Sequence, residues 1–370
     1  MRGNGASGDR PRVVLVSYHY YGSKRRAGFH FLADAYARLG WDVLFVTAPI
    51  SWMSFPRRDP RLAYPVRRDA ARERRHPDGV RSRVLFTLFH PANLRLGILN
   101  RLVRPLYTRY TRIGLGALEA DVRAADLVVF ESTPALLLVE RFRKLNPRAR
   151  YVYRVSDDLD LLRVHPLVID IERRVAPTVE LVSASSAAIA RRFAGLRNAR
   201  VDEHGIDKQL FDASHPNPYS GGKNALFLGF WPLDDFFLRE AAEQFPDVEF
   251  HVIGRLPKVR SANVVAHGEL PFDETVPYVQ HASMGLHTVA YQPGIEVLTD
   301  SLKVLQFSYC GLPIVTPAFV ASDRPNVVTY RPDDQASVRA AVERALAVGR
   351  MPELKNGIRS WEELATALTD

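Results

Sequence analysis

The stretch TDSLKVLQFSYCGLPIVTP at residues 299–317 places a cation where a helix already carries positive charge. Its polar first residues and helical spacing predict a helix that begins near Ser301, and the apolar run LPIV predicts a buried strand after it. Lys303 then lies in the first turn, with Gln306 one turn later on the same face. Because helix starts attract anions, Lys303 is either a solvated surface lysine or the partner of a strongly anionic ligand.

An acidic cluster, SDDLD at residues 156–160, is the second group that could do chemistry. It follows the apolar run YVYRV, so Asp157 is expected at the carboxyl end of a buried strand, where parallel sheets bind ligands. A partly buried carboxylate there can act as a general base. Asp158 is an alternative because predicted strand ends shift by a residue, and His19 follows the first predicted strand in the same way. The cluster could also simply cap a helix.

These residues must be positioned by alternating strands and helices. The runs at residues 12–18, 41–47, 126–132 and 151–156 are short and rich in β-branched or aromatic residues, and helical spacing separates several of them. Such a βαβ opening predicts a parallel sheet with right-handed crossovers. The same rhythm starts again near Lys223, which predicts a second doubly wound domain.

The length of 370 residues, with 46% hydrophobic and 25% charged residues, also favours two globular domains. We expect the first over residues 1–205 and the second over residues 206–350. Residues 351–370, which include Trp361, are expected to form a terminal helix that packs back on the first domain.

Charge is distributed unevenly between the two halves. Residues 1–200 contain 36 Lys and Arg against 18 Asp and Glu, whereas the remainder contains 14 against 23. A basic first half suggests that it faces an anionic partner such as a membrane, a phospholipid-like substrate or nucleic acid.

The segment at residues 51–123 interrupts the strand and helix rhythm with arginines interspersed among Leu, Phe, Ile and Tyr. Its simplest interpretation is an insertion with a solvated basic face. The combination of cationic and apolar residues favours a surface that lies on an anionic bilayer. Nucleic acid is disfavoured as a partner because no RNA-binding signature accompanies the arginines.

Several classes of protein are disfavoured by what the sequence lacks. The one cysteine, Cys310, excludes an internal disulfide framework and fits a reducing, cytoplasmic compartment. No apolar run approaches the length of a membrane span. The second predicted domain has neither GxGxxG nor a P-loop, which argues against dinucleotide oxidoreductases and P-loop ATPases.

The segment DSLKVLQFSYCGLPIVTP resembles the donor-site helix of GT-B glycosyltransferases, with a lysine followed by G-x-P before a strand. Together with GFW, HGEL and AY earlier in the second half, it is similar to the bacterial xanthan-pathway β-1,2-glucuronosyltransferase family. The resemblance implies a GT-B architecture of two Rossmann-like domains facing a cleft. It implies an inverting, metal-independent enzyme, peripherally bound at the inner face of the cell membrane, that uses a UDP-sugar, with UDP-glucuronate as the candidate. The acceptor would be a polyprenyl-pyrophosphate-linked oligosaccharide in exopolysaccharide biosynthesis.

The resemblance also assigns donor contacts in the second domain. It places Lys303 on the phosphates of the donor, with Gln306 one turn on. Ser301 and Asp300 could cap the helix or donate hydrogen bonds there. A glutamine rather than the glutamate of retaining relatives at position 306 favours inversion. Tyr291 matches a tyrosine near the phosphates.

The uracil contacts come from two other segments. Glu269 and Leu270 match the loop that holds the base in the family. Leu270 and Trp231 stand where the family has methionine, and both substitutions keep an apolar contact. The loop at residues 292–299 is shorter than that of the family, so the donor sugar is not fixed by the resemblance.

The catalytic aspartate of the family falls in the acidic pair of this sequence, which favours Asp157, with Asp158 and His19 as alternatives. Arg25 and Arg26 are candidates for holding the pyrophosphate of the acceptor. The Asp158-x-Asp160 pair resembles the metal-binding DxD of GT-A enzymes, but that single-domain fold would not need the motif around Lys303. Two other hypotheses stay open. One is a retaining GT-B enzyme with a soluble acceptor, and the other is a non-catalytic scaffold that binds a membrane or partner.

Overall fold

The computed structural model describes residues 10–70 and 72–370. Residues 1–9 and 71, which belong to the expected first domain, lie outside this description. The chain divides into two compact units. The first contains Ala27–Asp202, the segment up to Ser23 and the terminal segment Glu362–Asp370. The second contains Glu203–Trp361 and the short segment Lys24–Arg26.

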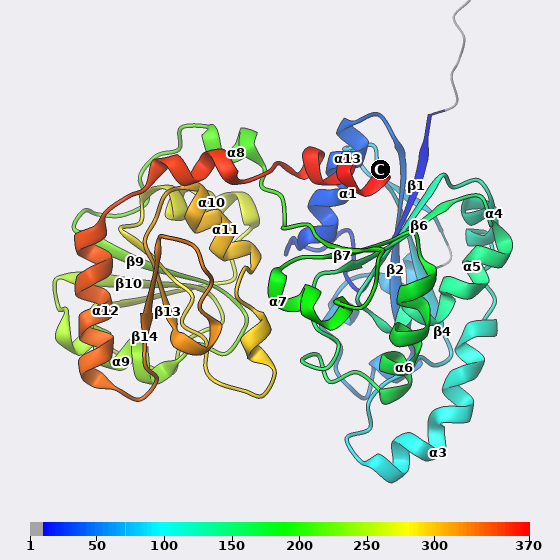
Figure 1. Cartoon of the computed structure of the whole chain (residues 1–370), viewed down its shortest axis with the longest axis horizontal. Helices are drawn as coiled ribbons and strands as arrows, with labels where there is room; N and C mark the ends of the chain where they lie inside the picture. The colour runs from blue at the N-terminus through cyan, green and yellow to red at the C-terminus, as the bar shows by residue number, and fades with distance from the viewer. Residues whose placement is uncertain (1–9, 71) are drawn as a thin grey trace, which may run out of the picture. The chain divides into compact units, whose positions relative to one another are not determined.

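The first unit is built on an eight-stranded sheet of the described residues, in the order β3-β4-β2-β1-β5-β6-β7-β8 (Figure 1). All neighbouring strands are parallel except β3 and β4. The strands are β1 Arg12–Ser17, β2 Asp42–Ser51, β3 Arg74–Arg75, β4 Arg81–Thr87, β5 Leu127–Glu131, β6 Arg150–Val155, β7 Leu181–Ala184 and β8 Ala199–Val201.

Helices connect these strands in the way that the βαβ pattern predicts. They are α1 Gly28–Arg38, α2 Val66–Asp69, α3 Gly97–Thr108, α4 Leu118–Arg123, α5 Val139–Leu145, α6 Pro166–Val175 and α7 Ala187–Ala190. The last helix of the chain, α13 Trp361–Thr369, contributes to this unit as well, since Tyr36 of α1 donates a hydrogen bond to the carbonyl of Ala365 over 3.0 Å.

The basic segment at residues 51–123 differs from the expected insertion in one respect. Its strand β4 pairs with β2 along most of its length, so residues 81–87 complete the sheet. Sequence periodicity missed this strand because arginines at positions 81 and 83 occupy its partly buried start, where Arg81 pairs with Asp42 and Asp121. Only α3 and the turns around it remain outside the strand and helix rhythm.

The second unit contains a fully parallel sheet, with six strands in its described residues in the order β11-β10-β9-β12-β13-β14. The strands are β9 Lys223–Gly229, β10 Val248–Gly254, β11 Val264–Gly268, β12 Met284–Leu286, β13 Ile314–Pro317 and β14 Val327–Tyr330. The helices are α8 Lys208–Asp212, α9 Asp235–Gln244, α10 Phe272–His281, α11 Leu302–Tyr309 and α12 Gln335–Val348.

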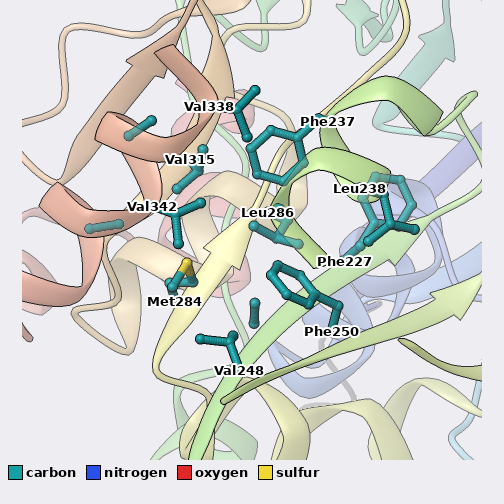
Figure 2. Close-up of a cluster of buried hydrophobic side chains, with 14 of the residues drawn as sticks. Phe227, Phe237, Leu238, Val248, Phe250, Met284, Leu286, Val315, Val338 and Val342 are labelled. Atoms are coloured by element: carbon teal, nitrogen blue, oxygen red, sulfur yellow. The ribbon is translucent and has the colours of Figure 1, made fainter. Parts of the chain in front are cut away.

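Period-two alternation along the strands gives this sheet two apolar faces. In β9, Phe227 points to the core under α9 and α12, where it packs with Phe237 and Leu286 (Figure 2). Its neighbours Leu226 and Leu228 belong to the opposite core, which contains residues of α10 and α11. Helices cover both faces, so the predicted α/β class with doubly wound parallel sheets is confirmed. No helix among the described residues could cross a membrane.

Close packing at Gly285 brings α11 against the middle of the sheet. A Cβ atom built on Gly285 would lie 2.4 Å from the ring of Phe307, which is fully buried in α11. The position of the helix that carries Lys303 therefore depends on the missing side chain of β12.

We predict that Gly285→Ala lowers the free energy of unfolding by about 1–3 kcal/mol, because the buried Phe307 ring must shift. Urea unfolding of the purified protein measures this. Gly357→Ala is the matched control, since no atom lies within 4 Å of its added Cβ. Equal stability of the two variants would contradict the packing argument.

Candidate functional site

The ammonium group of Lys303 is buried although the residue as a whole is partly exposed. Its Nζ lies 4.3 Å from the centroid of the Phe227 ring and has no hydrogen-bond partner among the described residues. Burial lowers the pKa of this ammonium to about 7. A cation buried in this way at the start of α11 lowers the stability of the unliganded protein, which indicates a binding site for an anion.

Three more buried polar atoms lack a partner in the described part of the chain: Nδ1 of His287 and Oγ1 of Thr288 after β12, and Oγ of Ser301 at the start of α11. Ser301 is the N-cap of α11, yet its side chain makes no capping bond. His287 and Thr288 directly follow β12, the strand beside β9. We call these four residues the Lys303 cluster. Each unpaired buried group costs about 1–3 kcal/mol, which a bound ligand could offset.

The imidazole of His287 is held in one tautomer. Its Nε2 lies 2.8 Å from the carbonyl oxygen of Leu298, which can only accept, so Nε2 carries the proton. Burial, and secondarily the charge of Lys303, lower the pKa of His287 to about 3, so the ring is neutral and Nδ1 is an acceptor. Sequence reasoning missed His287 and Thr288, although a polar pair after a buried strand in GLHTVAY was a usable signal.

The acidic residue beside Ser301 has a different role. Asp300 accepts a hydrogen bond from Arg324 over 2.9 Å and another from Thr299 over 2.9 Å. Arg324 in turn contacts Glu203 at 2.7 Å. This network fixes the loop before α11 and leaves the hydroxyl of Ser301 available to a ligand.

The remaining expected donor contacts lie in α11 and in the loops after β9, β11 and β12, and their exposure varies. Gln306 is buried at 5% exposure inside α11, and Trp231 is half-buried after β9. Glu269 is exposed after β11, whereas Leu270 packs partly against the core. Tyr291 is 62% exposed and lies edge-on to Phe319, so its described ring contact is outside the Lys303 cluster.

In the first unit, the structure separates the roles of the two adjacent aspartates. Asp158 is buried, forms an ion pair with Arg192 at 2.7 Å and accepts the backbone N–H of Asp160. Asp157 is half-buried, and its own N–H donates to the hydroxyl of Ser132 over 3.1 Å. Asp158 thus holds a turn rather than a helix start, because the next helix, α6, begins at Pro166 with His165 as its N-cap. Asp157 stays the candidate base.

The Asp158-x-Asp160 pair binds an arginine. Arg192 contacts Asp158, Asp160 and Glu172 at 2.6–2.8 Å. Within the described residues, no group of three or more His, Cys, Asp or Glu side chains is arranged to hold a metal ion.

A carboxyl group that sequence reasoning missed lies beside His19. Glu131 ends β5, is buried, and accepts hydrogen bonds from the hydroxyl of Ser17 at 2.5 Å and the N–H of Tyr18 at 3.0 Å. Its Oε1 lies 3.8 Å from Nε2 of His19, and burial raises the pKa of Glu131 to about 7. His19 follows β1, Glu131 ends β5 and Asp157 follows β6. Since these three strands are neighbours in the sheet, the three residues lie at the same edge. The run VVFES offered the signal, a polar residue that ends a buried strand.

Arg25 and Arg26, the arginines expected at the pyrophosphate of the acceptor, lie in a short segment that groups with the second unit. Lys24–Arg26 belong to the second unit, where the guanidinium of Arg25 lies 4.2 Å from the centroid of the Phe230 ring. Phe230 directly follows β9, whose carboxyl end also approaches Lys303.

Comparison with known proteins connects this arrangement to a family. Residues 15–185 match the family model described as Glucuronosyltransferase GumK, N-terminal domain. A protein of Xanthomonas campestris pv. campestris, UDP-glucuronate:glycolipid 2-beta-glucuronosyltransferase, is 32% identical over 347 residues. That alignment covers 92% of this chain and 86% of the relative.

Solved structures show the same fold at low identity. OtsA in its apo form matches with a TM-score of 0.64 at 12% identity, covering 96% of this chain and 98% of that one. AviGT4, a glycosyltransferase of avilamycin A biosynthesis, matches with a TM-score of 0.53 at 13% identity, covering 96% and 95%. The two sheets and the Lys303 cluster agree with the alignment over nearly the whole chain. The protein therefore belongs to the GumK glucuronosyltransferase family and is a glycosyltransferase of the GT-B fold.

Proposed function

We propose that this protein transfers glucuronic acid from UDP-glucuronate to a hydroxyl group of a polyprenyl-pyrophosphate-linked oligosaccharide, with inversion. The observation that carries the proposal is the buried, unpartnered ammonium of Lys303 at the start of α11. The donor, the glycolipid acceptor and the β linkage are those in the name of the Xanthomonas relative.

The second unit would bind the donor. A diphosphate at the start of α11 would meet the N–H groups of the first helical turn, the hydroxyl of Ser301 and the charge of Lys303. The same groups would stabilise the negative charge that develops on UDP as it leaves. Glu269, Leu270 and Trp231 are the residues that we assign to the uracil end, with Tyr291 and Gln306 nearer the phosphates.

The first unit would supply the acceptor and the base. The sugar of UDP-glucuronate is α-linked, so a β product requires one displacement at the anomeric carbon from the opposite side. The acceptor oxygen forms the new bond, the bond to the diphosphate breaks, and Asp157 takes the proton of the acceptor hydroxyl. Asp158 is held by Arg192, which supports Asp157 as the base. The reaction as proposed needs no metal ion.

The finer proposal that the enzyme lies on an anionic membrane rests on α3. Apolar side chains of α3 and the residue before it are exposed, among them Leu96 at 58%, Ile98 at 63% and Leu102 at 69%. Arg95, Arg101, Arg109 and Arg112 are exposed on the same segment. Figure 1 shows α3 at the periphery of its unit. Apolar residues flanked by cations complement a bilayer with anionic headgroups, so we place the protein at the cytoplasmic face of the cell membrane.

Hydrogen bonds tie this helix to the segment that follows Asp157. Nε2 of His165 contacts the carbonyl of Asn100 in α3 at 3.0 Å, and the amide of Asn93 donates to the carbonyl of Arg163 over 2.9 Å. A lipid-linked acceptor that reaches the protein along α3 would therefore meet the segment that follows the candidate base in the chain.

The first prediction concerns the base. Asp157→Asn should lower the rate of transfer to a lipid-linked acceptor by about 10²- to 10⁴-fold, because proton removal is lost, while UDP affinity stays unchanged. Transfer assays with UDP-glucuronate and calorimetric titration with UDP measure the two. Asp158→Asn should mainly lower stability. Full activity of the Asp157 variant would assign the base to Asp158 or His19 instead. If the unmodified protein turned over no sugar nucleotide, the hypothesis of a non-catalytic scaffold would remain.

The second prediction concerns the proton on Lys303. In the free protein the pKa of this ammonium is about 7, and a bound diphosphate should raise it toward the ordinary value of 10.5. Between those values the free lysine is neutral and the bound one is charged. UDP binding at pH 8.5 should therefore take up about one proton, and UDP affinity should fall as the pH rises. Calorimetry in buffers of different ionisation enthalpy measures the uptake.

Lys303→Met should abolish this proton uptake and weaken UDP binding at least about tenfold. It should also stabilise the free protein by about 1–4 kcal/mol at pH 7. The folded state binds fewer protons than the unfolded state between the folded and ordinary pKa values, so the wild-type protein gains stability as the pH rises through that window. Lys223→Met, at an exposed ion pair with Asp247, is the control. An unchanged affinity would remove Lys303 from the donor site.

The third prediction concerns α3. The double substitution Ile98→Asp and Leu102→Asp should weaken binding to vesicles of phosphatidylcholine and phosphatidylglycerol at least about tenfold, since two apolar contacts are lost. Leu256→Asp, at a residue that is 65% exposed in the other unit, should have no such effect. Vesicle sedimentation measures both. Equal binding of the two variants would place the membrane contact elsewhere.

A further inference from the structure

Two atoms of the Lys303 cluster demand opposite hydrogen-bonding partners. The ammonium of Lys303 has N–H donors and no acceptor. The Nδ1 atom of His287 has a lone pair and no proton, because Nε2–H is directed at the carbonyl of Leu298. The hydroxyl groups of Thr288 and Ser301 can take either role. A ligand that satisfies the whole cluster must therefore offer acceptor oxygens and at least one O–H or N–H donor.

The position of His287 makes it part of a binding edge rather than of the apolar core. It follows β12, between the strand ends of β9 and β13, at the carboxyl edge where parallel sheets bind ligands. It is 1% exposed, and the adjacent Thr288 is fully buried. The charge of Lys303 acts on its ring, so the two side chains share one environment. Two neighbouring polar side chains that lack partners at such an edge indicate polar ligand atoms.

We infer that His287 is a specificity-determining residue whose Nδ1 accepts a hydrogen bond from a hydroxyl of the nucleotide sugar, while Lys303 binds the adjacent diphosphate. The inference rests on the proposed donor site. A diphosphate alone would not satisfy His287, because its ionised oxygens have no proton to donate. The hydroxyl next to the diphosphate belongs either to the ribose or to the transferred sugar, and both present the same O–H group.

Two isosteric substitutions separate the functions of the two ring nitrogens. His287→Gln can keep an N–H near Nε2 for the carbonyl of Leu298 but has no acceptor in the place of Nδ1. His287→Asn keeps an acceptor oxygen near Nδ1 and loses the bond to Leu298. A residue that only supports the fold would be rescued by Gln, and a residue that recognises a hydroxyl would be rescued by Asn.

Calorimetric titration of the whole protein with UDP, 2′-deoxy-UDP and UDP-glucuronate tests the inference, with thermal unfolding as the check that each variant is folded. We expect the Gln variant to lose at least about tenfold in affinity and the Asn variant to stay near wild type. A loss for UDP that disappears with 2′-deoxy-UDP assigns the ribose 2′-hydroxyl. A loss for UDP and 2′-deoxy-UDP alike assigns the other ribose hydroxyl, and a loss confined to UDP-glucuronate assigns the transferred sugar.

Wild-type affinity of the Gln variant for all three ligands would overturn the inference. The partner of Nδ1 would then be a buried water molecule. An Asn variant that binds as weakly as the Gln variant would overturn it too, because the acceptor would then be irrelevant. Failure of the wild-type protein to bind any uridine nucleotide is a different result, which would reject the proposed donor site itself.

Discussion

A buried ammonium ion that has no hydrogen-bond partner among the described residues is the constraint on which the candidate site of the second unit depends. Lys303 lies above the ring of Phe227 at the positive end of α11, where desolvation and the helix dipole both act against its charge. The sheet supports this arrangement, because Gly285 lets α11 approach the central strand and the Asp300–Arg324 network fixes the loop before it. Folding energy thus maintains a buried cation, which the proposed diphosphate would neutralise.

In the first unit the buried charges are of the opposite sign, since several carboxyl groups lie at one sheet edge. Asp158 is neutralised by Arg192, and Glu131 is buried under hydrogen bonds from Ser17 and Tyr18. These environments differ from that of half-buried Asp157 on the same edge. Differences of this kind allow neighbouring carboxyl groups to serve separate roles, one in structure and another in proton transfer.

The two halves of the chain also differ in charge, since residues 1–200 are strongly basic and the remainder is acidic. Exposed arginines flank the apolar side chains of α3, whereas in the second unit the buried ammonium of Lys303 lies at a helix start. Under the proposed function, a buried cation in an acidic unit would bind a diphosphate locally without attracting anionic lipid headgroups over the whole surface of that unit.

The sequence by itself determined two doubly wound, mainly parallel sheets, because β-branched runs alternate with helical spacing, although it missed β4 at the basic edge. It also pointed to Lys303 and to the acidic pair through local motifs. The tertiary structure decided what local patterns do not contain. Arg192, which is 34 residues from Asp158, separates that aspartate from Asp157. The fold also buries Glu131 beside His19, and a carbonyl at position 298 selects the tautomer of His287. These choices depend on contacts between distant segments and on desolvation, which arise only when the chain is packed.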